Sequence, residues 1–292
     1  MNSSGESLNS VGGEAGSFPS LDHTLLYEHW WRPGRDPKAG VVLVHGLAEH
    51  SGRYHEFIRF LLEQGFAVDT FDLRGHGQSQ GAAVFVREFE EYLSDLDLFM
   101  DRVKARLPGK PIFLVGFSMG GGIVALYCIL HKPQIRGAVL SGPTVRLNQN
   151  LSPLLQKVSG VLGRMAPGLK LKRIDHHLVS RDKDVQQAYD RDPLVYRHGL
   201  KARLGAELIR STQLIQKLAE NFSYPVLLLQ GGEDKLVDPT AAPWFYEKIS
   251  SSDRTLKVYP ELFHEVLNEP EKEQVRRDIL TWLDAHVRSD DR

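Results

Sequence analysis

Residues 111–121 read Pro-Ile-Phe-Leu-Val-Gly-Phe-Ser-Met-Gly-Gly and set a serine between two glycines. The four residues before the first of these glycines form a short unbroken hydrophobic run, as expected of a strand that is buried on both faces. Residues 122–130 are also hydrophobic and indicate a buried helix. Glycines at 116 and 120 allow strand and helix to approach closely while the serine Oγ stays exposed on the turn between them. We therefore predict that Ser118 is a nucleophile on a strand–turn–helix elbow; the alternative interpretation is a Gly/Ser-rich turn without chemistry.

The composition excludes several classes of protein. The 292 residues include 36 basic and 37 acidic side chains, for a formal net charge of -1, and this balance does not predict nucleic-acid binding. The longest nearly apolar stretch, residues 121–130, is about half of what a membrane-spanning helix needs. Cys128 is the only cysteine, which excludes an intramolecular disulfide and is typical of a small core residue.

The N-terminal segment is rich in Ser, Gly and Asn. Residues 1–16 have neither the basic segment nor the hydrophobic segment of a signal peptide. We therefore expect residues 1–18 to be a disordered tail, and the protein to be cytoplasmic.

Strand-like and helix-like segments alternate along the rest of the chain. Short hydrophobic runs predict strands at residues 25–31, 41–44, 66–71, 112–115, 137–140, 226–229 and 256–259. Hydrophobic residues at helical spacing predict helices at 54–64, 89–106, 122–130, 240–249 and 270–286. Strands joined by helical crossovers form a mostly parallel sheet with helices on both faces, and reactive groups gather at the carboxyl ends of its strands.

One segment of about 70 residues interrupts this alternation. From 144 to 216 the sequence contains helical patches and polar loops but no candidate strand. We expect a helical cap over 144–216, inserted in a core formed by 19–143 and 217–292. Within the cap, Ser152-Pro153 is a good helix start, and the hydrophobic stripe that follows ends at Pro167.

A nucleophilic serine needs a base, and that base is oriented by an acid. His264 follows the strand at 256–259 and precedes the last helix, where it can reach back over the sheet. Two candidate acids, Glu233 and Asp234, follow the strand at 226–229, whereas Asp238 precedes a proline and caps the next helix. We select Asp234 because it lies just beyond the strand end, after two glycines, where it can orient His264; Glu233, with its longer side chain, is the weaker candidate. The chain order Ser118, Asp234, His264 is that of α/β-hydrolases.

The oxyanion formed during attack on a carbonyl needs two backbone donors. One is expected from the N–H of Met119, directly after the nucleophile, and the other from the N–H of Leu47, in the loop after the strand at 41–44. No His/Cys/Asp cluster has metal-ligand spacing, and the adjacent His176 and His177 are interpreted as surface residues of the cap. We expect neither a metal nor a cofactor.

Three motifs carry a resemblance to a known family. They are His-Gly-Leu-Ala-Glu-His-Ser-Gly-Arg-Tyr at 45–54, Asp-Leu-Arg-Gly-His-Gly-Gln-Ser at 72–79 and Gly-Phe-Ser-Met-Gly-Gly at 116–121, with Tyr-Asp-Arg-Asp-Pro-Leu at 189–194 in the cap. Together they resemble the monoacylglycerol lipase family, which is grouped with lysophospholipase-like serine α/β-hydrolases. The resemblance extends from about Leu25 to the last helix.

The resemblance implies hydrolysis of a monoacylglycerol to fatty acid and glycerol without a cofactor. It implies that Glu49, Arg53 and Tyr189 bind substrate, with the first two at the polar end of the pocket near the glycerol. The mammalian members carry a second histidine three positions after the catalytic one, where this chain has Leu267. The lid cysteines of those members are also missing.

Two alternative functions are compatible with these motifs or with the predicted fold. A broad-specificity carboxylesterase for short to medium acyl chains, or a lysophospholipase, would use the same catalytic residues. A non-catalytic ligand-binding member of the fold would be expected to have lost a triad residue, and all three are present.

The expected partner is a small lipid ester, and nothing indicates a protein partner. The hydrophobic stripe of the cap either packs on the core or lines an acyl pocket and touches a membrane surface. In the second case Lys170, Lys172 and Arg173 would lie near anionic headgroups.

Overall fold

The computed structural model describes residues 12–146, 153–171, 173 and 175–287. Its strands are β1 (Glu14–Pro19), β2 (Leu25–Trp31), β3 (Ala39–Val44), β4 (Phe66–Phe71), β5 (Ile112–Phe117), β6 (Gly137–Ser141), β7 (Val226–Gly231) and β8 (Arg254–Tyr259). They form one sheet in the order β1-β2-β4-β3-β5-β6-β7-β8. Strands β3 to β8 run parallel, whereas β2 is antiparallel to both β1 and β4. The predicted mostly parallel sheet is confirmed.

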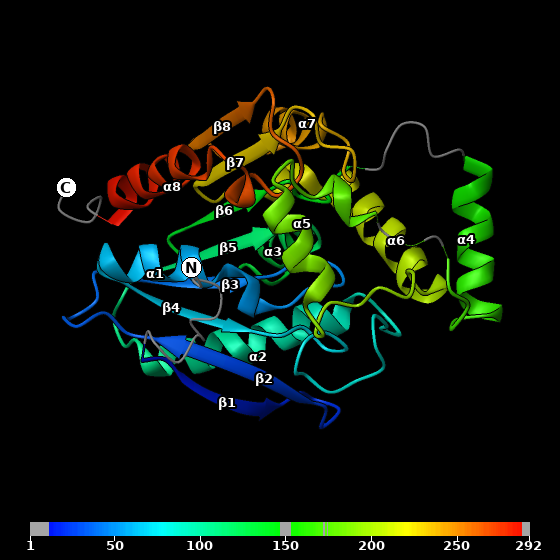
Figure 1. Ribbon diagram of the computed structural model, residues 1–292, viewed down its shortest axis with the longest axis horizontal. Helices are drawn as coiled ribbons and strands as arrows, with labels where there is room; N and C mark the ends of the chain where they lie inside the picture. The colour runs from blue at the N-terminus through cyan, green and yellow to red at the C-terminus, as the bar shows by residue number, and fades with distance from the viewer. Residues whose placement is uncertain (1–11, 147–152, 172, 174, 288–292) are drawn as a thin grey trace.

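Helices cover both faces of this sheet (Figure 1). On one face α1 (His55–Glu63) and α8 (Lys272–Val287) pack against the strands, and on the other lie α2 (Glu90–Arg106), α3 (Met119–His131) and α7 (Ala241–Lys248). The sequence of β3 does not alternate between hydrophobic and polar residues, because both faces of the strand are buried. Val41 and Leu43 pack in the hydrophobic cluster on the face covered by α1 and α8, and Val42 and Val44 pack in the cluster on the face covered by α2, α3 and α7. Every residue of the strand is therefore buried.

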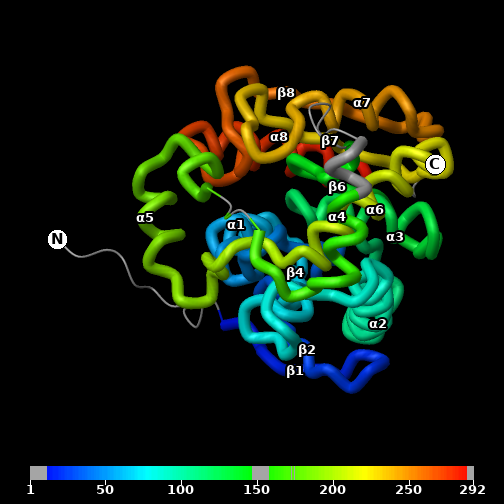
Figure 2. The backbone as a smooth tube through the Cα atoms, turned by 90° about the vertical axis from the view of Figure 1, so that its right-hand side faces the viewer, coloured from blue at the N-terminus to red at the C-terminus, as the bar shows by residue number. Residues whose placement is uncertain are grey.

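The segment between β6 and β7 is helical. It contains α4 (Pro153–Met165), α5 (Lys183–Arg191) and α6 (Ala202–Leu218), with a 3-10 turn η3 (His176–Leu178). Its described residues contain no strand, only one isolated bridge between Lys170 and Lys201. In Figures 1 and 2 these helices lie beyond the carboxyl ends of the parallel strands. The helices α4 and α5 lie within the segment 144–216, α6 extends two residues beyond it, and α4 begins at Pro153.

The predicted disordered tail is wrong for residues 14–18. These residues belong to β1, which pairs along its whole length with β2. Phe18 is buried and stacks on Phe99, and the Ser20 hydroxyl just beyond the strand donates to Asp95 at 2.6 Å. The composition did not reveal this strand because Phe18 is its only buried side chain. Residues 1–11 lie outside the described part of the chain.

Among the described residues, no helix has both the length and the hydrophobicity needed to cross a bilayer. The remaining regular segments are three short 3-10 turns: η2 (Ser51–Tyr54), η4 (Ala219–Asn221) and η5 (Val266–Asn268).

Candidate active site

Ser118 occupies the turn between β5 and α3. Its φ of 53° and ψ of -117° lie in a sparsely populated region for a residue with a side chain. A Cβ on Gly116 would lie 2.5 Å from the Gly120 carbonyl oxygen, and a Cβ on Gly120 would collide with the Val44 carbonyl oxygen. The strand–turn–helix elbow predicted from residues 111–121 is therefore present, and the two glycines are needed for the reason given.

The loops after β7 and β8 bring Asp234 and His264 together. The Nδ1 of His264 lies 2.7 Å from Oδ2 of Asp234, and both side chains are buried. The same Oδ2 accepts from the Gln230 amide at 3.0 Å, and Oδ1 accepts the backbone N–H groups of Leu236 and Val237 at 2.9 and 3.0 Å. The carboxylate is thus held by four donors and fixes the imidazole. Glu233, the weaker candidate, is exposed.

The electrostatics of this pair favour a basic imidazole. Burial by itself lowers the pKa of His264, but the charge of Asp234 and its hydrogen bond outweigh burial, and the pKa stands above its ordinary value of 6.5. Because Nδ1–H donates to Asp234, the lone pair of the neutral ring is on Nε2.

Ser118 and His264 line one cavity of about 250 Å³. The hydrophobic part of its wall includes Val179, Leu208, Leu236, Val237 and Leu267, from the cap and from the loops after β7 and β8. The polar part includes Glu49, Tyr54, Tyr189, Glu265 and Asn268. A cavity lined by both apolar and polar side chains suits an amphiphilic ligand.

Leu47 and Met119 line this cavity beside Ser118. Among the described loop, turn and cap hydrogen bonds, none uses the N–H of either residue as the donor. His45 holds the loop that carries Leu47: its Nδ1 lies 2.8 Å from the Gly46 carbonyl oxygen, and its Nε2 accepts the Leu73 N–H at 2.9 Å. Burial lowers the pKa of His45 to about 4, so the ring is neutral and has a structural role.

Glu49 and Arg53 form a buried charged cluster behind the polar wall. One Glu49 oxygen accepts from the Gly46 N–H and from the Tyr54 hydroxyl, both at 2.6 Å, and the other lies 2.8 Å from the Arg53 guanidinium. The guanidinium also contacts both oxygens of Glu265, at 2.8 and 3.0 Å. Of the two predicted glycerol-binding residues, only Glu49 lines the cavity; Arg53 is not among the described residues that do.

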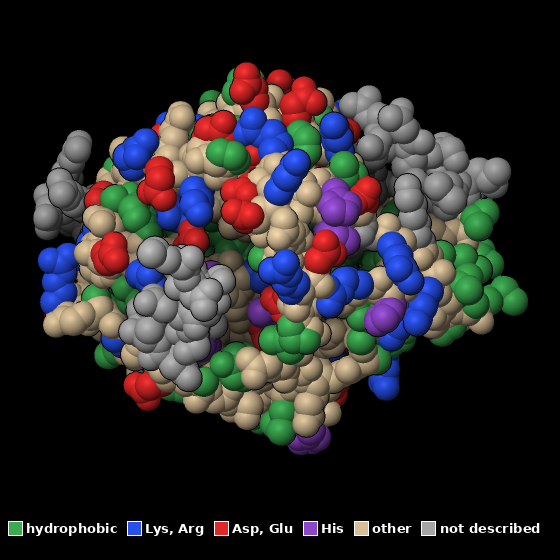
Figure 3. Space-filling model, viewed as in Figure 1, with side chains coloured by type: hydrophobic (Ala, Val, Ile, Leu, Met, Phe, Trp, Pro, Cys, Tyr) green, Lys and Arg blue, Asp and Glu red, His purple; other side chains and the backbone are tan. Residues whose placement is uncertain are grey.

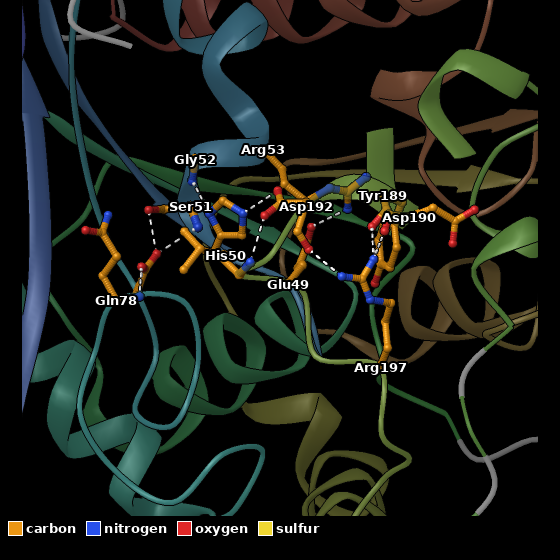
Figure 4. A network of polar contacts seen from close by, with 12 residues as sticks. Glu49, His50, Ser51, Gly52, Arg53, Gln78, Tyr189, Asp190, Asp192 and Arg197 are labelled. Carbon is orange, nitrogen blue, oxygen red and sulfur yellow. Dashed lines mark hydrogen bonds and ion pairs between the residues drawn. The ribbon is translucent and has the colours of Figure 1, made fainter. Parts of the chain in front are cut away.

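Tyr189 reaches the cavity from α5, and Arg53 lies over its ring at 4.3 Å. A second contact ties α5 to the same loop: Nε2 of His50 lies 2.8 Å from Oδ2 of Asp192 (Figure 4). Figure 4 also shows Arg197 reaching the end of α5, where it donates to the carbonyl groups of Tyr189, Asp190 and Asp192. The cap is therefore hydrogen-bonded to the loop that leads from β3.

The sequence interpretation missed Glu265, Tyr54 and Asn268. Glu265 directly follows His264, yet its partner Arg53 lies 212 positions away, and no local pattern connects them. Asn268 donates to Glu265 at 2.8 Å and completes the same network. The only available signal was that Glu265 is adjacent to a predicted catalytic residue.

Three residues without metal-ligand spacing in the sequence nevertheless form a cluster of potential metal ligands in the fold. His176, His177 and Asp190 each offer one donor atom, and the three atoms lie within 4.8 Å of one another. The fold brings η3 against the end of α5, which the separation of these residues in the sequence does not reveal.

The fold and the buried His–Asp pair beside an elbow serine define a serine hydrolase of the α/β-hydrolase class. A family model described as "Serine aminopeptidase, S33" matches residues 35–271. Monoacylglycerol lipase of Mycolicibacterium smegmatis is 37% identical over 271 residues, which cover 93% of this chain and 97% of that protein. Human monoglyceride lipase is 35% identical over 267 residues, covering 90% and 88%.

The crystal structure of Paleococcus ferrophilus monoacylglycerol lipase superimposes with a TM-score of 0.80 at 33% identity, covering 89% of this chain and 99% of that one. The chain therefore belongs to the monoacylglycerol lipase family of serine hydrolases, and it is a carboxylic ester hydrolase.

Proposed function

We propose that the protein hydrolyses monoacylglycerols to fatty acid and glycerol through a covalent acyl-enzyme on Ser118. The observation that carries the proposal is the 2.7 Å contact between His264 and Asp234 at a cavity that Ser118 also lines. The choice of a glycerol ester as the substrate rests on the relatives, which are named monoacylglycerol lipase and monoglyceride lipase. The amphiphilic cavity supports it, because a monoacylglycerol has one apolar and one polar end.

The reaction begins with attack by Ser118. The Nε2 lone pair of His264 takes the hydroxyl proton, and Oγ adds to the ester carbonyl carbon to give a tetrahedral intermediate. The imidazolium is stabilised by the Asp234 carboxylate, which keeps its own charge. As the C–O bond to glycerol breaks, His264 returns the proton to the leaving alkoxide.

Water then repeats these steps on the acyl-enzyme. His264 takes a proton from water, hydroxide adds to the carbonyl carbon, and Ser118 leaves with the proton returned by the imidazolium. The products are a fatty acid and the free enzyme, and no cofactor takes part.

The backbone N–H groups of Leu47 and Met119 stabilise the oxyanion in both intermediates. Their position beside Ser118, with no acceptor in the described loop and cap hydrogen bonds, supports this role. Glu49 also fixes the Leu47 loop, because its carboxylate holds the N–H of Gly46.

The two ends of the substrate have different surroundings. The acyl chain lies along the hydrophobic wall formed by residues such as Leu208 and Val237. Glycerol lies toward Glu49 and Tyr189. Arg53 does not line the cavity, but its hydrogen bond to Glu49 fixes the charge and the position of that carboxylate.

We further propose that the cap touches a lipid surface, from which the substrate enters. Val158, Val161 and Met165 of α4 are 48%, 58% and 82% exposed, and Leu169 just beyond is 47% exposed. Figure 3 shows hydrophobic side chains gathered at the edge of the molecule where Figure 1 places α4. An exposed apolar helix face followed by basic residues such as Lys170 is typical of interfacial binding.

One substrate panel tests the reaction. Wild type and Ser118→Ala are assayed with p-nitrophenyl esters, monoacylglycerols and lysophospholipids of increasing acyl length. Wild type is expected to prefer monoacylglycerols of medium to long acyl length. A preference for short soluble esters or for lysophospholipids would contradict the lipase assignment.

A fluorophosphonate probe tests the nucleophile. Wild type is expected to be labelled once and Ser118→Ala not at all. Ser141→Ala is the matched control, because this second serine also lines the cavity, and it should keep the label. Labelling of Ser118→Ala would overturn the assignment.

Vesicle co-sedimentation tests the surface contact. The double change Val161→Asp and Met165→Asp is expected to reduce binding to phosphatidylglycerol vesicles. Leu21→Asp is the control, since Leu21 is 71% exposed on the connection between β1 and β2. Equal binding of all three proteins would exclude α4 as the contact.

A further inference from the structure

Three metal-ligating side chains meet on the cap, outside the cavity that holds Ser118. His176 and His177 belong to η3, and Asp190 lies in the last turn of α5. One donor atom from each residue lies within 4.8 Å of the other two. Nε2 of His176 lies 2.6 Å from Oδ1 of Asp190.

The surroundings of His177 fix which ring nitrogen is available. Its Nδ1 lies 3.1 Å from Oε1 of Gln186, and the amide nitrogen of the same glutamine donates to the His177 and Ser180 carbonyl groups at 3.2 and 2.9 Å. With the amide oriented in this way, Oε1 accepts from Nδ1–H, and the lone pair of His177 is on Nε2. Metal-binding histidines are oriented in the same way, by a carbonyl oxygen that holds the other ring N–H.

His176 and Asp190 have unused capacity for a ligand. Nε2 of His176 is buried and makes no hydrogen bond of good geometry within the described part of the chain. Among the described residues, the Asp190 carboxylate has no lysine or arginine within 4 Å. Arg197 donates to the Asp190 backbone carbonyl oxygen, and no ion pair between Arg197 and the Asp190 carboxylate occurs within the described part of the chain.

We propose that His176, His177 and Asp190 bind a divalent transition metal of the zinc type. Two imidazole nitrogens and one carboxylate oxygen suit zinc, cobalt or nickel better than magnesium or calcium, which prefer oxygen ligands. Tetrahedral bonds of about 2.0 Å place ligand atoms roughly 3.3 Å apart. To reach that spacing, the His176–Asp190 pair moves apart from 2.6 Å, and donor atoms that are up to 4.8 Å apart move closer together.

The fourth coordination position is available to water. His176 and Asp190 line a second cavity of about 410 Å³, which shares Leu47 and Tyr189 with the catalytic cavity but is not lined by Ser118 or His264. The Tyr189 ring stacks on His176 with the ring centres 5.4 Å apart and an interplanar angle of 6°. The metal therefore lies behind the wall of the catalytic cavity and takes no part in acyl transfer.

Cobalt titration tests the site, because four-coordinate Co²⁺ with nitrogen and oxygen ligands absorbs visible light and replaces zinc. The full chain without an affinity tag is titrated with Co²⁺, and Zn²⁺ is then added as competitor. Wild type is expected to bind one Co²⁺ per chain, with an absorption that Zn²⁺ abolishes. Equilibrium dialysis with Zn²⁺ gives the affinity independently of the spectrum.

Variants distinguish the site from incidental binding. His177→Ala and Asp190→Asn are expected to weaken binding at least tenfold, and Gln186→Ala about 10–100-fold through loss of ring orientation. His198→Ala is the matched control, an exposed histidine of the same cap, and should bind as wild type does. Hydrolysis of a p-nitrophenyl ester without metal shows that each variant is folded. The proposal is overturned if wild type shows no saturable binding of one metal, or if His177→Ala and Asp190→Asn bind as tightly as His198→Ala.

Discussion

The guanidinium of Arg53 binds both carboxylate oxygens of Glu265, at 2.8 and 3.0 Å, although 212 residues separate them. Glu265 follows His264, and Arg53 lies four residues after Glu49, so one ion pair joins the loop of the base to the loop of the oxyanion donor. Burial by itself raises the pKa of Glu265, but Arg53 outweighs burial and holds it below the ordinary value. The pair is charged at neutral pH and aligns two parts of the site that come from opposite ends of the chain.

Replacing Arg53 by methionine is expected to destabilise the fold. The change leaves the Glu49 and Glu265 carboxylates buried without a cation, which costs about 3–5 kcal/mol. Urea denaturation measures the loss. Lys104→Met is the control, because its ion pair with Asp101 is exposed and contributes about 0–1 kcal/mol. Equal losses in the two variants would show that the Arg53 cluster does not stabilise the protein.

The dependence of kcat/KM on pH reports the protonation of His264. The base must be neutral to accept the serine proton, so activity falls as the pH decreases through its pKa. Since Asp234 raises that pKa above 6.5, the midpoint of the acid limb is expected above pH 6.5. A rate that stays constant down to about pH 5 would exclude His264 as the base.

The Asp234→Asn variant is expected to shift the acid limb of the pH profile to lower pH than in wild type. Without the carboxylate charge, burial dominates and lowers the pKa of His264, so the midpoint falls below that of wild type. The rate at the optimum falls by about 10⁴-fold, because an amide stabilises neither the tautomer nor the imidazolium. Steady-state kinetics across pH measures both effects. An unchanged midpoint would show that Asp234 does not raise the pKa of His264.

Replacing a helical glycine by alanine is expected to have opposite effects at Gly120 and at Gly160. A Cβ on Gly120 meets the carbonyl oxygens of Val44 and His45, so Gly120→Ala displaces the loop that carries Leu47. We expect kcat to fall by about 10²-fold. In Gly160→Ala on α4 the new Cβ meets nothing within 4 Å, and the helix is stabilised by about 0.5–1 kcal/mol with activity unchanged. Full activity of Gly120→Ala would contradict the close packing at the elbow.

Filling the hydrophobic wall is expected to alter acyl-length preference. Leu208 of α6 lines the cavity of about 250 Å³, and a tryptophan there takes up part of its volume. For Leu208→Trp, kcat/KM for a dodecanoyl ester should fall at least about tenfold relative to a butyryl ester. Ile209→Trp changes the next residue of the same helix, which is not among the lining residues, and should keep the wild-type ratio. The same ratio in both variants would place the acyl chain elsewhere.

The strand and helix predictions were accurate where local patterns are strong. Strand β2 (25–31) and strand β4 (66–71) have the predicted bounds, because both are rich in aromatic and aliphatic residues and both are followed by turn residues. Strand β1 was missed because a single buried phenylalanine in a Gly/Ser-rich edge strand gives no periodic signal. The elbow was recognised because its requirements are local: two residues without side chains around one strained serine.

Local patterns in the amino-acid sequence are enough to predict the class of fold, the elbow serine and the order of the candidate triad. These properties depend on hydrophobic periodicity and on backbone sterics over a few residues, and both are written in consecutive positions. The contact between Asp234 and His264, the ion pairs by which Arg53 joins Glu49 to Glu265, and the cluster of His176, His177 and Asp190 are seen in three dimensions alone. Such contacts join loops at the ends of different strands, and the parallel sheet, not separation along the chain, sets the distances between them.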